Sequence, residues 1–173
     1  EIIQTTGWYK PAIENSNLPG YVVLDGGLIP PGGLDNFKNG FLPANYQASI
    51  LRAGAEPVAN IRPSDSIAGI QDEKLAFLKK MDHNLLDGLG GADEIESAIS
   101  NYELAYKMQS SIPELTQFGS ESAITRELYG LNSPDLHTRS YGAQCLLARR
   151  LIERGVRFIE LTCPSVDGGA DRW

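Results

Sequence analysis

The feature that most constrains the fold of this chain is a helix, a glycine and a buried strand that follow one another directly at residues 141–162. Apolar residues recur every three or four positions along one helical face: Tyr141, Cys145, Ala148 and Leu151 or Ile152. Gly155 suits the left-handed position that ends many helices. The segment VRFIELT at 156–162 is apolar on both faces, as is typical of a strand in a parallel sheet. The sequence therefore predicts half of a β-α-β unit and a parallel or mixed sheet covered by helices. We favour this architecture over a helical bundle, although half of the helical residues would suit a bundle equally well.

Turn-forming stretches such as PAIENSNLPG and LDGGLIPPGGLDN dominate the first 63 residues. One short apolar run, Tyr21 to Leu24, lies between Gly20 and the sequence Asp25-Gly26-Gly27. We predict that residues 1–63 are mostly loop around this single buried strand.

Two helices are predicted between Asp65 and Pro113. Asp65 or Ser66 is expected to cap the start of the first helix, and Gly88 to end it. The second is expected to be capped by Asp93 and to close before Pro113. The apolar stripe of the first helix is Leu75, Leu78, Met81 and Leu85, and that of the second is Ile95, Ile99, Tyr102, Ala105 or Tyr106, and Met108.

The stretch GLGGAD at 88–93 indicates a hinge between these two helices. Residues 65–111 are therefore predicted to form a helical hairpin, which stands over one end of the sheet or packs against it as an outer layer. A short helix capped by Ser120 and ending at Gly130 is expected next, and LNSPD at 131–135 predicts a turn.

Composition argues against two classes of partner. The 173 residues carry 15 Lys and Arg against 22 Asp and Glu, and a net charge of −7 disfavours binding to polyphosphate backbones. No apolar stretch approaches the roughly 20 residues that cross a bilayer. We predict neither a nucleic-acid partner nor a membrane span. Arg149, Arg150 and Arg154 lie on the last predicted helix, where pairing with carboxylates or a solvated face is expected rather than an anion site.

Candidate chemistry gathers in the last stretch, CPSVDGGADRW at 163–173. Asp167 and Asp171 are four residues apart with glycines between them, so both carboxylates can face one cation. A solvated turn explains the same spacing, and both interpretations stay open. His83 and His137 have no distinctive ligands at metal-binding spacing and are expected to be non-functional, while Cys163 is expected to pack at a strand end.

Five segments spread over nearly the whole chain carry a family resemblance: LPGYVVLDGG, GGLDNFKNGFLPANYQ, NYELAYKMQSSIPELTQF, ESAITRELYGL and YGAQCLLARRLIERGVRFIEL. In this order they resemble an uncharacterised bacterial family grouped with sulfatases and alkaline phosphatases. The resemblance implies part of an alkaline-phosphatase-like three-layer α/β/α fold with the helical hairpin inserted. Residues 1–173 would then be a fragment of one such domain. Cys163-Pro164 does not match the Cys-x-Pro-x-Arg nucleophile motif of sulfatases.

The same resemblance implies a metal-dependent hydrolase of phosphate or sulfate esters, acting on a small-molecule or glycan substrate. In that family the strand equivalent to VRFIEL leads into Trp-Asp-x-His, whose Asp and His would bind a divalent cation, with zinc as the first candidate. This chain stops at Trp173, before that Asp. No catalytic or metal-binding residue is therefore carried over, and Asp167, Asp171 and Trp173 are expected to lie next to the active site.

The start at Glu1, rather than Met, is interpreted as a cut inside a longer chain. A signal segment in the missing part would direct the whole protein to the periplasm or another extracytoplasmic compartment. The alternative to a hydrolase is a non-catalytic binding or scaffold protein that keeps the fold without metals.

Overall fold

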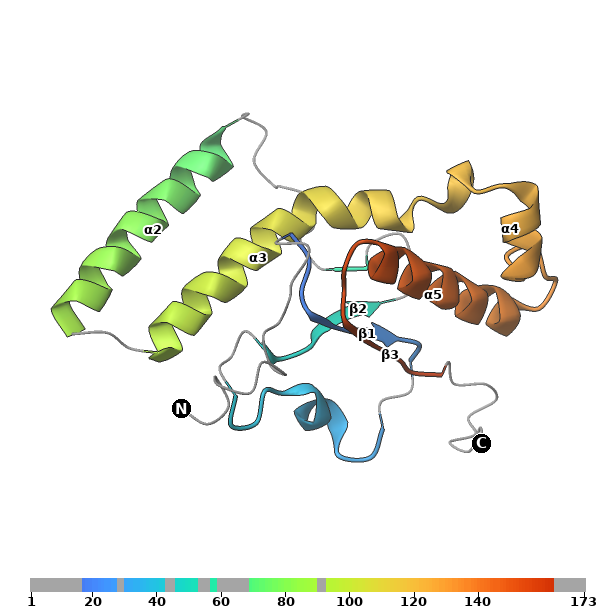
Figure 1. Cartoon of the computed structure of the whole chain (residues 1–173), viewed down its shortest axis with the longest axis horizontal. Coiled ribbons are helices and arrows are strands. Elements are labelled where there is room, and N and C mark those ends of the chain that lie inside the picture. Colours follow the sequence, from blue (N-terminus) through green and yellow to red (C-terminus); the bar gives the residue numbers. More distant parts are fainter. Residues whose placement is uncertain are drawn as a thin grey trace.

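A three-stranded parallel sheet with strand order β2-β1-β3 organises the computed structural model. Its strands are β1 (Tyr21–Asp25), β2 (Ser49–Arg52) and β3 (Phe158–Leu161). The structure describes residues 17–27, 30–42, 46–52, 57–58, 69–89 and 93–163. Helices α3 and α5 lie on one side of the sheet, and the short helix η1 (Gly33–Phe37) lies on the other (Figure 1). The prediction of a parallel sheet covered by helices is confirmed at this level.

Strand β2 corrects the prediction of a single strand in the first 63 residues. It is only four residues long, and of these only Leu51 is buried, so its own apolar pattern is weak. Its backbone pairs with β1 in register, with Val23 opposite Ile50. This segment is therefore a strand because it pairs with β1, and its own local sequence does not reveal that pairing.

Helices α2 (Ile70–Leu89) and α3 (Asp93–Thr116) form an antiparallel pair that projects beyond the sheet (Figure 1). Side chains join them along their length: Gln71 Nε2 donates to Gln109 Oε1 at 2.8 Å, and Lys79 pairs with Glu103 at 3.0 Å. Only the last part of α3 packs on the core, where Ile112 is fully buried.

The ends of both helices differ from the predictions. The helix α2 begins at Ile70, where the Glu73 N–H donates to the Gly69 carbonyl at 3.1 Å. The predicted cap residues Asp65 and Ser66 lie outside the described residues. Gly88 lies within α2 rather than after it. Asp93 is the first residue of α3, and that helix continues through Pro113. The proline lacks the N–H that would bond to the carbonyl four residues earlier, and α3 bends towards its C-terminal end (Figure 1).

The apolar stripe predicted for α2 does not form part of the core. Leu78, Met81 and Leu85 are exposed, as is Phe77, with 63% of its surface open to solvent. In the predicted stripe of α3, by contrast, Met108 is buried. The stripe is exposed because α2 contacts α3 at one side only and lies away from the sheet. Among the described residues, no helix combines the length and apolar character that a membrane span requires.

The core lies between the sheet and the two helices α3 and α5 (Leu136–Glu153). It contains mainly aliphatic side chains: Leu18, Val22, Leu24, Leu51, Met108, Ile112, Leu115, Leu147, Ala148, Leu151 and Val156.

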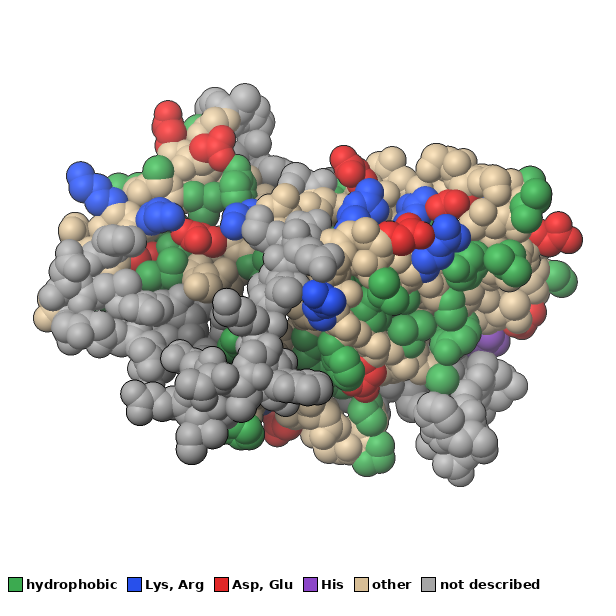
Figure 2. Space-filling view, viewed as in Figure 1, with side chains coloured by type: hydrophobic (Ala, Val, Ile, Leu, Met, Phe, Trp, Pro, Cys, Tyr) green, Lys and Arg blue, Asp and Glu red, His purple; other side chains and the backbone are tan. Residues whose placement is uncertain are grey.

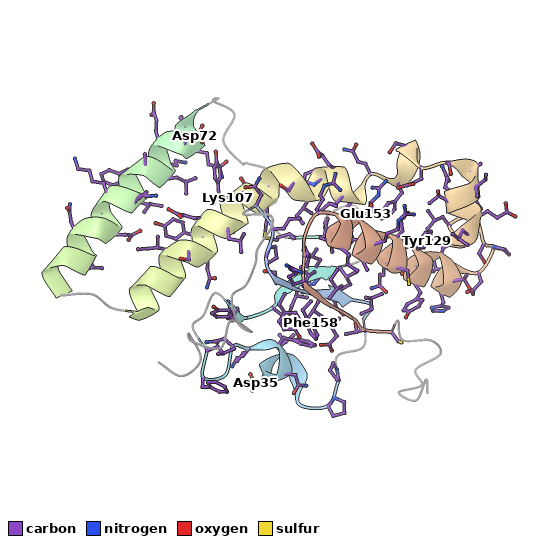
Figure 3. All side chains as sticks on the ribbon, viewed as in Figure 1. Asp35, Asp72, Lys107, Tyr129, Glu153 and Phe158 are labelled. Atoms are coloured by element: carbon purple, nitrogen blue, oxygen red, sulfur yellow. The ribbon has the colours of Figure 1, made fainter. Side chains whose placement is uncertain are left out.

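On β1, Tyr21 and Val23 alternate with the core residues and face the other side. There the Tyr21 ring meets Phe158 edge-on, with ring centroids 4.9 Å apart (Figure 3), and the Tyr21 hydroxyl donates to Glu160 at 3.0 Å. Burial and this carboxylate raise the pKa of Tyr21 to about 12, which keeps the hydroxyl a donor at neutral pH.

Side-chain caps begin the two C-terminal helices, and a glycine follows the last one. Ser122, rather than Ser120, caps α4 (Ala123–Leu128), because its hydroxyl accepts from the Thr125 N–H at 3.0 Å. Asp135 caps α5 by accepting from the Thr138 N–H at 2.6 Å. Gly155 has a φ of 89°, so the predicted left-handed end of the last helix is confirmed.

Arg150 of α5 connects three segments that follow one another in the chain. Its Nη1 donates to the carbonyls of Leu115 at 2.8 Å and Gln117 at 3.1 Å, at the end of α3. Its guanidinium pairs with Glu121, through Nε at 2.9 Å, and lies 5.1 Å from the centre of the Phe118 ring in η3 (Phe118–Ser120). Only 12% of the Arg150 side chain and 20% of the Glu121 side chain are exposed.

The other two arginines of the predicted basic cluster also pair with carboxylates, Arg149 with Glu153 and Arg154 with Glu114. Arginine and acidic side chains gather over this part of the surface (Figure 2). The prediction that this basic cluster pairs with carboxylates is therefore confirmed.

Replacing Arg150 by Met should lower the free energy of unfolding by about 3 kcal/mol, because Glu121 and the last carbonyls of α3 then lose their partner in a poorly solvated place. Arg150→Lys should recover only part of this loss, since an ammonium group lacks the planar fork. Arg149→Met is the matched control on an exposed pair and should change stability little. Urea titrations of the three variants measure the differences, and equal effects of Arg149→Met and Arg150→Met would contradict this account.

Gly142 allows α5 to pack directly against the turn that follows α4. A Cβ placed at Gly142 would lie 1.8 Å from the carbonyl oxygen of Tyr129, and Tyr129 lies in that turn beside α5 (Figure 3). No side chain fits this space without a shift of backbone.

We expect Gly142→Ala to lower the free energy of unfolding by about 3 kcal/mol, at the upper end of the usual cost of overpacking. Gly88→Ala is the control, because a Cβ at Gly88 in α2 would meet no atom within 4 Å. Alanine favours a helix over glycine by about 1 kcal/mol, so the control should be neutral or more stable. Thermal unfolding followed by circular dichroism compares the two variants. An unchanged melting temperature for Gly142→Ala would contradict the close approach of Gly142 to the Tyr129 carbonyl.

Candidate functional site

The carboxyl ends of the three parallel strands meet at one edge of the sheet. Asp25 ends β1, Arg52 ends β2, and Thr162 and Cys163 follow β3. Ligands of open α/β sheets bind outside the carboxyl ends of the strands. This edge is therefore the first place to look for a functional site.

Asp25 and Thr162 shape the centre of that edge. The Thr162 hydroxyl accepts from the Gly26 N–H at 2.7 Å, and the Thr162 N–H donates to the Leu24 carbonyl at 3.0 Å. This buried threonine holds the end of β3 against the turn that leaves β1. The same turn is closed on its other side, because the Gly27 N–H donates to Asp25 Oδ1 at 2.8 Å.

The Asp25 carboxylate is consequently held in place, while one oxygen remains for another partner. Among the described residues, Oδ2 of Asp25 receives no hydrogen bond. A half-buried carboxylate at the end of the central strand is suited to bind a cation or a hydroxyl group. Within the described ranges, however, no group of three or more His, Cys, Asp and Glu side chains gathers at metal-binding distance.

The residues predicted from the sequence to lie next to the active site, Asp167, Asp171 and Trp173, lie outside the described residues. The described chain reaches Cys163 at the carboxyl edge, so the segment that carries them starts there. The His83 side chain also lies outside the described part, and His137 lies in the first turn of α5. Burial raises the pKa of the Cys145 thiol, which favours an unreactive, packed cysteine.

A cavity of about 330 Å³ opens next to the end of β2, between the end of α3 and the first half of α5. Most of its lining surface is apolar, although polar and apolar residues both contribute to the wall. They come from β2, α3, η3 and α5: Arg52, Thr116, Phe118, Leu136, Arg139, Ser140, Ala143, Gln144 and Leu147. One face of α5 serves both the core and the cavity. It enters the core at Leu147 and Leu151, and it lines the cavity from Leu136 to Leu147. Because α3 ends at Thr116, residues of η3 and β2, rather than a further turn of α3, line the cavity together with this part of α5.

Gln144 is the most unusual residue of the cavity wall. Its side chain is 3% exposed, and neither the amide nitrogen nor the amide oxygen has a hydrogen-bond partner in the described part of the chain. A buried polar group without a partner costs about 1–3 kcal/mol. Native proteins retain few such groups, and each calls for an explanation such as an internal water or a ligand.

Arg139 lies one turn before Gln144 on the same wall. Its Nη1 donates to the carbonyls of Ser133 and Pro134, the latter at 2.9 Å, so the turn before α5 fixes one side of the guanidinium. Among the described residues, Nε and Nη2 of Arg139 have no partner. The cavity wall thus combines a cation with free donors and apolar surface, while the unpaired amide of Gln144 is closed off from solvent.

Comparison with known proteins identifies the family of the chain. Residues 8–173 match the model of a family described as "Protein of unknown function (DUF1501)". The chain belongs to this family. No curated protein and no solved structure matched the chain.

The DUF1501 description names no activity. Sequence reasoning missed Asp25, Arg139 and Gln144. A signal for Gln144 was present, because it stands four residues before Ala148 and seven before Leu151, on the same helical face. Asp25 could have been marked as an acidic residue directly after a buried strand.

We expect Gln144→Leu to raise the free energy of unfolding of this DUF1501 protein by about 1–2 kcal/mol, because a side chain of similar volume replaces an unpaired buried amide. Leu147→Gln is the reverse substitution at a neighbouring position of the same wall. It should strongly lower the free energy of unfolding, because it buries a new amide. Urea unfolding in buffer without added ligand measures both. A lower stability of Gln144→Leu would show that the amide has a structural partner.

Proposed function

We propose that the protein acts as a metal-dependent hydrolase of phosphate or sulfate esters, with the reacting ester at the carboxyl edge of the sheet. The observation that carries this proposal is the position of Asp25, which ends the central strand at the edge where the segment with Asp167 and Asp171 departs from β3. The family resemblance in the sequence supports the same reaction class.

The described residues fit one part of a metal site. Asp25 would provide one carboxylate ligand, and the Gly27 N–H fixes its orientation. A catalytic cation needs about three protein ligands, so Asp167 and Asp171 are proposed to complete the set. A bound divalent cation would polarise the ester oxygens and lower the pKa of an attacking water. Thr162 positions the turn that carries Asp25 by bonding to Gly26.

A second candidate function is that of a binding protein without catalysis. The cavity between α3 and α5 favours it, because apolar surface and the remaining donors of Arg139 can hold a ligand without any metal. The two functions differ in whether ester hydrolysis accompanies binding.

Asp25→Asn is the decisive variant, since the amide oxygen still accepts from the Gly27 N–H while the negative charge is lost. We expect zinc affinity and hydrolysis of 4-nitrophenyl phosphate or 4-nitrophenyl sulfate to fall about tenfold or more. Asp35→Asn is the control, because Asp35 is exposed and pairs with Lys38 at 2.6 Å on η1. Calorimetric zinc titration and metal analysis check the first effect, and a spectrophotometric assay checks the second.

Two results would change the proposal. Tight zinc binding that Asp167→Ala or Asp171→Ala abolishes, but Asp25→Asn leaves unchanged, would place the metal in the terminal segment alone. A folded protein that binds no metal and hydrolyses neither ester would favour the binding protein.

A further inference from the structure

Two arginines without a carboxylate partner line the cavity between α3 and α5. Arg52 and Arg139 both belong to its wall, and no Asp or Glu is among the described residues that line it. In the part of the chain that the structure describes, neither arginine forms an ion pair, whereas Arg149, Arg150 and Arg154 each pair with a carboxylate. Two cations at one mostly apolar cavity repel each other, and an anion between them removes this repulsion.

The turn before α5 holds the Arg139 guanidinium in a geometry that suits an anion. Its Nη1 donates to the carbonyls of Ser133 and Pro134, and Nε and Nη2 have no partner among the described residues. Asp135, one turn earlier, does not pair with this guanidinium and accepts instead from the N–H and the hydroxyl of Thr138. Nε and Nη2 lie on one side of the planar group, so they can donate in parallel to two oxygens of one carboxylate or phosphate.

The apolar part of the wall determines what else the ligand carries. Phe118, Ala143 and Leu147 line the cavity, and most of its lining surface is apolar. The Arg150 guanidinium lies 5.1 Å from the centre of the Phe118 ring, on a residue outside the cavity wall. A volume of about 330 Å³ is at the lower end of the range of about 300–1,000 Å³ for small-molecule sites. An inorganic anion would leave the apolar surface in contact with water, whereas an anion with one ring would cover it.

We propose that this cavity binds a small organic anion, namely one apolar ring that carries a single carboxylate or phosphate group. The anionic oxygens would accept from Nε and Nη2 of Arg139, and the exposed Arg52 would add positive charge at the end of β2. The ring would lie against Phe118 and Leu147. Gln144 takes no part, because its amide is closed off from solvent. The inference does not depend on the hydrolase and names the ligand class of the second candidate function.

The test is NMR chemical-shift titration with benzoate, phenyl phosphate, benzyl alcohol and acetate, in low-salt buffer with chelator and no metal. The wild-type protein should bind benzoate or phenyl phosphate at least about tenfold more tightly than benzyl alcohol, which lacks the charge, and than acetate, which lacks the ring. The tighter of the two anions identifies the head group. Added salt should weaken this anion and leave benzyl alcohol unchanged.

Substitutions separate the contribution of charge from that of the apolar wall. Arg139→Gln should weaken the tighter anion about tenfold and leave benzyl alcohol unchanged, because the charge-assisted hydrogen bonds are lost. Arg139→Lys should recover part of this loss, since the charge returns without the fork. Arg52→Gln should weaken the anion about threefold, because solvent screens an exposed charge. Arg126→Gln, a change on α4 outside the cavity wall, is the control and should have no effect.

The melting temperature of each variant checks its folding. Ala143→Leu keeps both arginines and narrows the cavity, so it should weaken the anion and benzyl alcohol alike and tests the site even where Arg139→Gln does not fold.

Three results would overturn the site: no binding of either ring-bearing anion by the wild-type protein, equal affinity for benzyl alcohol and the anions, or anion binding that neither Arg139→Gln nor Ala143→Leu changes. Zinc binding and ester hydrolysis are measured separately, so the two proposals can fail independently. Ester hydrolysis without metal-free anion binding would leave the hydrolase standing and remove this site. Arg139-dependent anion binding without hydrolysis would do the reverse.

Discussion

The contact on which this structure most depends is the insertion of the Arg150 guanidinium into the end of α3. A helix end leaves carbonyls without partners, and those of Leu115 and nearby Gln117 receive theirs from a side chain of another helix. The same guanidinium pairs with Glu121 and lies over Phe118. One side chain therefore fixes where α3 stops and how the chain returns to the sheet through α4 and α5.

The place where α3 stops also creates the cavity. Beyond Thr116 no further turn of α3 covers the first half of α5, so the inward face of α5 changes from core at Leu151 to cavity wall at Leu147 and the residues before it. Pro113 belongs to the same account, because it removes a backbone bond in the last turns and bends the helix there. The end of α3 thus supplies part of the core, through Ile112 and Leu115, and the wall of the cavity, through Thr116.

The sequence predicts the parts of the fold whose local pattern is strong. Tyr21–Leu24 and the unit of helix, Gly155 and strand combine apolar runs with suitable end residues, and the structure contains both. Strand β2 could not be predicted, since its pairing with β1 depends on the distant partner and not on its own four residues. The apolar stripe of α2 gave a wrong expectation for the opposite reason. Its period is helical, but periodicity does not show whether another element covers that face, and Leu78 is exposed.

The candidate site was harder to predict than the fold because its residues are ordinary in sequence. A glutamine within a helix is usually a solvated residue, and only the packing of α3, η3 and β2 around α5 shows that Gln144 is buried. Proteins tolerate such departures from good packing mainly at functional sites, where a stable neighbourhood offsets them. Here that neighbourhood is on the same helix, since Arg150 and Leu151 anchor α5 two turns further along. An anchored helix can therefore keep the unpaired Gln144 amide buried without rearranging, although burial of such a group costs about 1–3 kcal/mol.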